Sequence, residues 1–196
     1  MRIRRGAVAT IALGLLVALI GCTPSGPAAQ PPTTGDSAPP EAPPKVERPK
    51  NLDMAKADPC ELVDGLPRKT FGLDDRKGLA DDDSAVFPGN PSCFTLGFRT
   101  NLGLSVVTVS TEGVTSYIES VNVYPTPVTV KGYPAYVLAP ERQPENCYGV
   151  VDVNDGQLLY LSYGLNIPDE EPITPQQKLC EQVPQLAEEL LAGLGA

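Results

Sequence analysis

The chain has 196 residues, with 15 basic and 24 acidic side chains, a net charge of −9, and neither histidine nor tryptophan. The absence of histidine excludes the Ser-His-Asp and Cys-His arrangements of nucleophilic catalysis. The acidic balance disfavours nucleic acid as a partner, and it also disfavours electrostatic docking on anionic lipid, because like charges repel.

The N-terminal segment has the pattern of a secretory signal. Three arginines within the first five residues precede an unbroken apolar run from Ala7 to Ile20, which is the order of such signals. The run has 14 residues, fewer than the roughly 20 that a membrane span needs. It ends in Leu19-Ile20-Gly21-Cys22, which resembles a bacterial lipobox.

In bacterial lipoproteins, the chain is cut just before the lipobox cysteine, and the sulfur of that cysteine receives a diacylglycerol. We therefore predict a lipoprotein signal peptide over residues 1–21, cleavage between Gly21 and Cys22, and a lipid on Cys22. The alternative is an ordinary signal cleavage that leaves Cys22 as a free thiol. The residues after Arg4-Arg5 match twin-arginine export poorly, so we expect the Sec route.

Residues 22–50 have the composition of a tether. Nine of the 28 residues from Thr23 to Lys50 are proline, and large apolar side chains are almost absent. Such a segment cannot bury enough surface to offset its ordering entropy. We predict a lipidated, Pro-rich, disordered tether over 22–50 and one folded domain over 51–196. That domain carries 9 basic and 21 acidic residues, a net charge of −12.

The first helical signal in the domain is Asp58-Pro59-Cys60-Glu61, with Asp58 as N-cap and proline at the first helical position. It predicts a short helix to about Asp64, followed by a further turn over 68–72. Residues 74–91 are polar and interrupted by glycine and proline, so we predict a loop. Its acidic run Asp81-Asp82-Asp83 lacks the ligand spacing of a calcium loop and is predicted to be a solvated surface.

The middle of the domain predicts short strands and one helix. Strands are expected at 93–99, 104–110, 128–130, 135–138, 147–153 and 157–163. The triplet Asn154-Asp155-Gly156 between the last two is the clearest hairpin signal. Residues 114–121 have apolar side chains at helical spacing. Thr174-Pro175 predicts the start of a final helix, which Pro184 is expected to kink or split.

Together these elements predict an α+β domain. We expect an antiparallel sheet of five or six strands, with helices at the two ends of the domain and two disulfides linking it.

Four cysteines remain after Cys22, and an even number in an exported chain is typical of disulfides. Cys60, Cys93, Cys147 and Cys180 allow three pairings, and sequence alone does not choose between them. We favour Cys60–Cys93 and Cys147–Cys180, two loops of about 33 residues, each worth roughly 3 to 4 kcal/mol. No two of these cysteines have metal-ligand spacing, so we expect no metal and no cofactor.

Several short motifs occur in a familiar order. They are Asp58-Pro59-Cys60-Glu61-Leu62, Phe71-Gly72-Leu73, Ser92-Cys93-Phe94, Gly132-Tyr133-Pro134-Ala135-Tyr136, Cys147 with Asp155-Gly156-Gln157, and Cys180. Their order and spacing resemble the actinobacterial lipoproteins grouped as domain of unknown function 3558. The resemblance covers nearly all of Ala57 to Leu194. Where that family often has tryptophan, two residues after the second cysteine, this chain has Thr95.

The resemblance implies export, lipidation and an actinobacterial cell envelope, and it supplies no catalytic residues. The chain also lacks the nucleophile-elbow, phosphate-loop and zinc-protease motifs. We therefore expect a non-catalytic binding or interaction module, held by its lipid on the extracytoplasmic face of the cell membrane. Its partner would be an unknown envelope protein or ligand.

Two other functions are alternatives. One is a carboxylate-based envelope enzyme acting on glycans, and the other is a small-molecule or lipid carrier. Tyrosine is the commonest aromatic residue, with seven copies, and its rigid amphipathic ring suits glycan or peptide contact. Tyr148 and Tyr160, on the two sides of the last predicted hairpin, are the candidate ligand-binding residues.

Overall fold

The computed structural model describes residues 47–196. The predicted signal peptide, the lipidation site Cys22 and most of the predicted tether lie outside the described residues. Residues 47–196 lie within one compact unit, and both disulfides and the hydrophobic core lie within it. We therefore expect this unit to fold on its own. None of the described helices is both long and apolar enough to cross a membrane.

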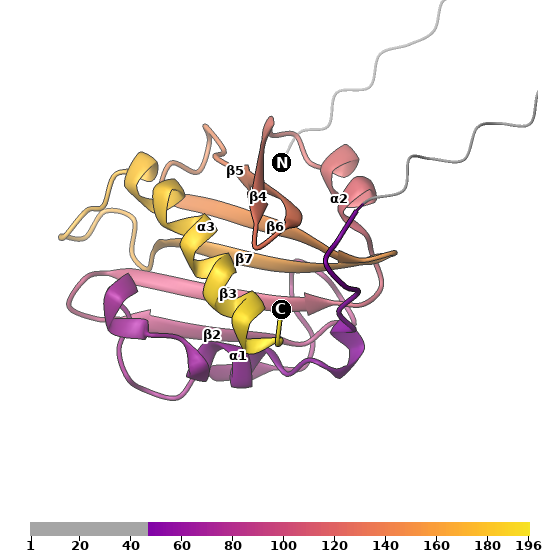
Figure 1. Cartoon of the computed structure of the whole chain (residues 1–196). Coiled ribbons are helices and arrows are strands. Elements are labelled where there is room, and N and C mark those ends of the chain that lie inside the picture. Colours follow the sequence, from indigo (N-terminus) through magenta and orange to yellow (C-terminus); the bar gives the residue numbers. More distant parts are fainter. Residues whose placement is uncertain (1–46) are drawn as a thin grey trace, which may run out of the picture. The chain divides into compact units, whose positions relative to one another are not determined.

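Seven antiparallel strands form one sheet in the order β1-β2-β3-β7-β6-β5-β4 (Figure 1). The strands are β1 (Leu79–Asp81), β2 (Ser92–Gly97), β3 (Leu102–Val109), β4 (Pro125–Val130), β5 (Tyr133–Leu138), β6 (Asn146–Asn154) and β7 (Gln157–Leu165). Two meanders, β1 to β3 and β4 to β7, meet where β3 pairs with β7. The domain is thus α+β, as expected.

The expected count of five or six strands is wrong, because the sheet has a seventh strand inside the predicted loop over 74–91. This strand is β1, whose three residues are all exposed and which pairs with β2 from Leu79↔Phe94 to Asp81↔Ser92. A short edge strand held by main-chain hydrogen bonds leaves no alternation of buried and exposed residues. The acidic run therefore begins on a strand.

The described helices are α1 (Pro59–Gly65), α2 (Val114–Ser120) and α3 (Gln176–Gly193), with 3₁₀ turns at Met54–Lys56 and Arg68–Phe71. The predicted N-cap of the first helix is confirmed, since Oδ1 of Asp58 accepts the amides of Cys60 (2.7 Å) and Glu61 (3.3 Å). Helix α3 lies across the strands of the sheet (Figure 1).

Helix α3 differs from its prediction at two points. It begins at Gln176 without a side-chain cap, and Nε2 of Gln176 instead donates to the carbonyls of Pro140 (3.0 Å) and Asn146 (2.9 Å). Pro184 does not split the helix, which is continuous through it. Proline removes one main-chain hydrogen bond, whereas a stripe of buried side chains including Leu179 and Leu186 holds both halves of α3 against the sheet.

Alternate residues of the central strands feed two hydrophobic clusters on opposite faces of the sheet. The larger cluster packs side chains such as Leu104, Leu161 and Tyr163 against α1 and α3. The smaller one packs Phe87, Tyr160 and their neighbours beneath α2 and the β1–β2 loop. These covering segments shield only one end of the second face, so the other end of that face is open.

Both disulfides connect a helix to the sheet. Cys60 on α1 is bonded to Cys93 on β2, and Cys147 on β6 is bonded to Cys180 on α3. These are the two pairs favoured from the sequence.

The folded domain includes residues assigned to the tether by composition. The side chain of Arg48 is only 7% exposed and lies 2.7 Å from Asp152 and 2.9 Å from Asp155, at the β6–β7 hairpin. Leu52 is buried, and its amide donates to the carbonyl of Val153 (2.9 Å). Packing of the chain around residue 48 thus begins before the expected boundary at residue 51.

Candidate functional site on the open face of the sheet

A straight row of four residues crosses the open end of the second sheet face. Phe94 on β2 pairs with Ser105 on β3, Ser105 pairs with Ser162 on β7, and Ser162 pairs with Tyr148 on β6. All four residues are partly exposed. Side chains of residues paired in register point to the same face of a sheet. The row therefore presents two hydroxyls between two aromatic rings.

Two glycines next to this row leave a depression in the sheet surface, because they have no side chains. Gly103 and Gly164 are paired neighbours on β3 and β7. A Cβ on Gly103 would lie 3.1 Å from the ring of Phe94, and one on Gly164 would lie 2.2 Å from Oδ1 of Asn146. The Phe94 ring and the Asn146 amide thus lean over the two glycines, and only residues without a side chain leave room for them.

The result is a central hollow of about 210 Å³, lined by Phe94, Gly103, Ser105, Asn146, Ser162, Gly164, Leu165 and Asn166. No charged residue lines this hollow, although the domain carries 30 of them (9 basic and 21 acidic). Its lining combines an aromatic ring, hydroxyls and amides, all of which are neutral. Such a surface is suited to a neutral, polar group with one apolar side.

Two further hollows flank the central one. On the β1–β2 side, about 130 Å³ is enclosed by residues including Arg76, Lys77 and Phe98, and Phe94 lines both this hollow and the central one. Beyond Tyr148, about 580 Å³ lies between segments 122–124 and 139–143. We call the three together the cross-strand groove.

The predicted residues Tyr148 and Tyr160 lie together, with ring centroids 6.0 Å apart and nearly parallel planes. Tyr160 is only 4% exposed and packs in a cluster with Phe87 and Tyr117. Burial raises the pKa of the Tyr160 phenol, and the neighbouring tyrosines Tyr117 and Tyr148 raise it further. Tyr160 is therefore a packed core residue beside the end of the groove, and Tyr148 is the more exposed member of the pair.

A hydrogen bond holds the partly exposed side chain of Tyr148 in place. Its hydroxyl donates to Oε1 of Gln143 at 2.6 Å. Burial raises the pKa of the Tyr148 phenol, and the Glu145 carboxylate adds to this effect. Tyr148 is thus a neutral, positioned ring at working pH.

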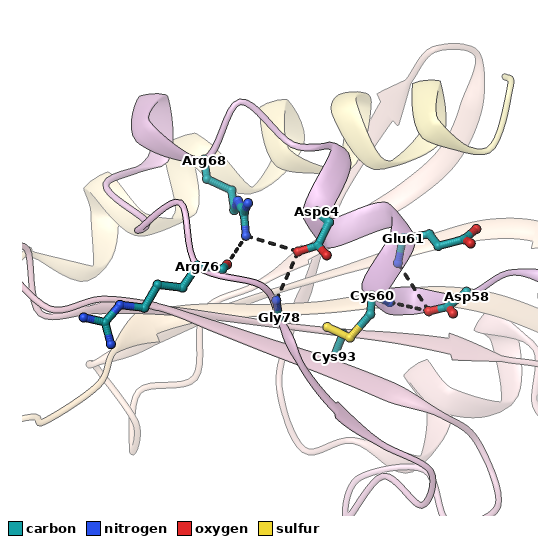
Figure 2. Close-up of a disulfide and its surroundings, with 8 residues drawn as sticks. All are labelled: Asp58, Cys60, Glu61, Asp64, Arg68, Arg76, Gly78 and Cys93. Carbon is teal, nitrogen blue, oxygen red and sulfur yellow. Dashed lines mark hydrogen bonds and ion pairs between the residues drawn. A yellow bond between two sulfur atoms is a disulfide. The ribbon is translucent and has the colours of Figure 1, made fainter.

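Hydrogen bonds next to the first disulfide hold the loop that carries Arg76, a residue of the first hollow (Figure 2). Asp64 on α1 accepts the amide of Gly78 (3.0 Å) and a hydrogen bond from Arg68 (3.2 Å), while Arg68 also donates to the carbonyl of Arg76. These bonds hold loop 76–78 beside Cys60–Cys93. The Arg76 side chain points away from the disulfide in Figure 2, and its guanidinium lies 5.0 Å from the centre of the Phe98 ring.

The charges of the cross-strand groove are opposite to those of the whole domain. Its linings contain the basic residues Arg76, Lys77 and Arg142 but only one acidic residue, Glu141. By contrast, a hollow of about 410 Å³ between α1 and α3 contains one basic and three acidic residues. The first hollow is therefore a locally basic site on an acidic domain, whereas Glu141 and Glu145 lie near the Tyr148 end of the groove.

The acidic side chains of the described residues are mostly on the surface. Asp152 is the one buried carboxylate of residues 47–196, and it is paired with Arg48. Within the same residues, no group of three or more histidine, cysteine, aspartate or glutamate side chains could hold a metal ion.

The sequence predicted only the end of the groove that contains Tyr148. The hairpin motif Asn154-Asp155-Gly156 predicted that the strands of Tyr148 and Tyr160 pair, because these strands are adjacent in the chain. Phe94 and Ser105 belong to another hairpin, and only the β3–β7 pairing places them on the same face. The available signal was the small residues at alternate strand positions, Gly103 and Ser105 on one strand and Ser162 and Gly164 on the other.

The fold and the groove define a small disulfide-linked α+β domain with one sheet face partly open. The family model described as "Protein of unknown function (DUF3558)" matches residues 17–192, and the chain belongs to this family. No curated protein and no solved structure matches the chain.

Proposed function

We propose that the protein is a lipid-anchored, non-catalytic binding module of the cell envelope, and that the cross-strand groove is its ligand-binding face. The row Phe94–Ser105–Ser162–Tyr148 carries this proposal. Its partly exposed aromatic and hydroxyl side chains stand at the end of the sheet face that α2 and the β1–β2 loop do not cover. An antiparallel sheet commonly leaves one face solvated, and aromatic side chains exposed on such a face mark a candidate interaction surface.

The lipobox and the Pro-rich segment support the location of this module. A lipid on Cys22 would hold the chain on the extracytoplasmic face of the cytoplasmic membrane. Residues 22–47, if extended, would let the domain reach up to roughly 80 Å from the lipid. A spacer of this kind favours a partner in the wall layer over a soluble substrate.

Two observations favour binding over the alternative functions. A glycan hydrolase needs two carboxyl groups facing one site, whereas the groove is lined by the single acid Glu141. A lipid carrier needs an enclosed apolar cavity, whereas the central hollow contains hydroxyls and amides and lies on the surface.

Two experiments test the two parts of the proposal. In cells fed an alkyne-tagged fatty acid, the full chain should take up the label and fractionate with membranes. The Cys22→Ser variant should lose both properties, while the control Ser25→Ala should keep them. If Cys22→Ser remains labelled and membrane-bound, the lipid anchor at this residue is wrong.

For the binding face, a photoreactive amino acid would be placed at position 162 in the groove or at position 115 on the exposed side of α2. We expect cross-linked adducts in intact cells from position 162 and not from position 115. Adducts from position 115 alone would contradict the assignment of the open face.

A further inference from the structure

We propose that the cross-strand groove binds a linear glycan that bears carboxylate groups, with one sugar ring in the central hollow. The inference rests on the proposed function and names the ligand of the same face.

The central hollow has the chemistry of a site for one sugar ring. It provides the ring of Phe94 as an apolar wall, the hydroxyls of Ser105 and Ser162, and the amide of Asn146. A sugar ring has one apolar side formed by C–H groups and a rim of hydroxyls, so it can pack on an aromatic ring while it donates and accepts hydrogen bonds. At about 210 Å³ the hollow is below the roughly 300–1,000 Å³ of a site for a whole drug-sized ligand.

The three hollows follow one line across the strands. Phe94 joins the first to the second. Gln143 lines the third hollow; its side chain accepts a hydrogen bond from the Tyr148 hydroxyl (2.6 Å), and its backbone carbonyl accepts one from the backbone N–H of Asn146 (3.0 Å). From Phe94 to Tyr148 the row covers three strand spacings, about 14 Å. A ligand that fills all three hollows must therefore be a chain.

The charges at the two ends of the groove identify the kind of chain. Arg76 and Lys77 lie in the first hollow without an acidic neighbour in its lining, the central hollow is uncharged, and the third hollow is lined by Arg142 and Glu141. A glycan with carboxylates at intervals places neutral rings on the row and anionic groups near the basic side chains. Attraction to Arg76 and Lys77 would also orient the ligand, with a carboxylate at the first hollow.

An acidic polypeptide fits this face less well. Extended peptides are commonly held by main-chain hydrogen bonds to a strand at the sheet edge. The groove presents side chains on a sheet face, and the β4 edge carries prolines at positions 125 and 127, which cannot donate such bonds.

The test uses amide chemical-shift perturbation by NMR on oxidised, ¹⁵N-labelled residues 44–196. The probes are soluble peptidoglycan strands, which bear carboxylates, neutral chito-oligosaccharides, and poly-L-glutamate as the acidic peptide. We expect the peptidoglycan strands to shift the amides of Phe94, Ser105, Ser162 and Tyr148. Chito-oligosaccharides should shift the same amides at about tenfold higher concentration.

Two pairs of variants connect the binding to the groove. Ser162→Leu fills the central hollow and should weaken peptidoglycan-strand binding about tenfold or more, whereas Thr115→Leu adds similar bulk on α2 and should not. Lys77→Glu with Arg142→Glu should weaken binding of the carboxylated strand but not of the neutral oligosaccharide. Lys178→Glu on α3 is the charge control.

The possible failures are distinguishable. Tighter binding of poly-L-glutamate, equal binding of the charged and neutral glycans, or the absence of glycan binding at millimolar concentration would each overturn the glycan assignment. If poly-L-glutamate shifts the groove amides, the proposed binding face survives without the glycan. If the probes shift only amides elsewhere, such as those of the α1–α3 hollow, the proposed face is wrong as well.

Discussion

The backbone of Gly78 lies against the sulfur of Cys93, so closely that a Cβ built on Gly78 would come within 2.3 Å of Sγ. The same Cβ would lie 3.4 Å from the sulfur of Cys60. Asp64 and Arg68 hold the loop in this place (Figure 2). Glycine at position 78 therefore lets the loop pack directly on the disulfide. Arg76, two residues earlier in the same loop, lies at the groove.

We predict that Gly78→Ala destabilises the oxidised domain by about 1–3 kcal/mol, because the new methyl group must displace the loop or the disulfide. Urea unfolding at neutral pH measures this change. The control is Gly65→Ala at the end of α1, where nothing lies within 4 Å of the added Cβ, and it should be neutral or slightly stabilising. Equal stability of the Gly78 and Gly65 variants would show that the loop is not tightly packed on the sulfur.

Arg48→Met should lower the free energy of unfolding by about 2 kcal/mol at pH 7, because it leaves the buried Asp152 carboxylate without its partner. Burial already raises the pKa of Asp152 above its usual value, against the opposing effect of Arg48. A carboxyl with a raised folded-state pKa binds its proton more tightly in the native state, so its contribution to stability falls as pH rises through this range.

Removal of Arg48 should raise the pKa of Asp152 further, so the loss of stability should be smaller at pH 4 than at pH 7. Urea unfolding of both chains at the two pH values tests this difference. Asp155→Asn is the control, since Asp155 is 91% exposed and its pair with Arg48 should contribute less than about 1 kcal/mol. A loss that is as large at pH 4 would contradict the role assigned to the Asp152 charge.

Tyr117→Phe should remove part of the alkaline destabilisation of the domain. Burial, helped by Tyr148, raises the pKa of Tyr117 to about 12. Because the native state holds this proton more tightly, stability due to Tyr117 is present below about pH 10 and falls between pH 10 and 12. At pH 11.5 the free energy of unfolding of the variant should exceed that of the parent by on the order of 1 kcal/mol, allowing for partial exposure of the ring.

Urea unfolding at pH 9 and pH 11.5 measures this gain. Tyr124→Phe is the matched control because Tyr124 is almost fully exposed. A similar gain in both variants would mean that the effect does not come from burial of Tyr117.

In the double variant Cys147→Ala, Cys180→Ala the free energy of unfolding should fall by roughly 3 to 4 kcal/mol, which is the loop-closure contribution expected for a loop of about 33 residues. The bond joins β6 to α3. Without it, α3 should unfold at a lower temperature than the sheet. Thermal unfolding followed at helical and tyrosine wavelengths measures both effects. A loss below about 1 kcal/mol would show that the buried side of α3 holds the helix without the covalent link.

Elements with strong local signals were predictable. Asp58 and Pro59 mark the start of α1, and Asn154-Asp155-Gly156 marks the β6–β7 turn, because caps and tight turns depend on a few adjacent residues. The edge strand β1 was missed because it buries nothing, and the unsplit α3 was missed because packing outweighs the one hydrogen bond that Pro184 removes.

By itself, the sequence determined the α+β class, the family, the positions of most elements and the residues that form the β6–β7 hairpin. Those features arise from periodicity, turn chemistry and motif order within short stretches of chain. Only the tertiary structure decided that β3 pairs with β7, that Arg48 docks on Asp152, and that Phe94 and Tyr148 stand on one open face. Each of these relationships joins residues about 50 or more positions apart, and no local pattern encodes which distant partner a strand or a charge will meet.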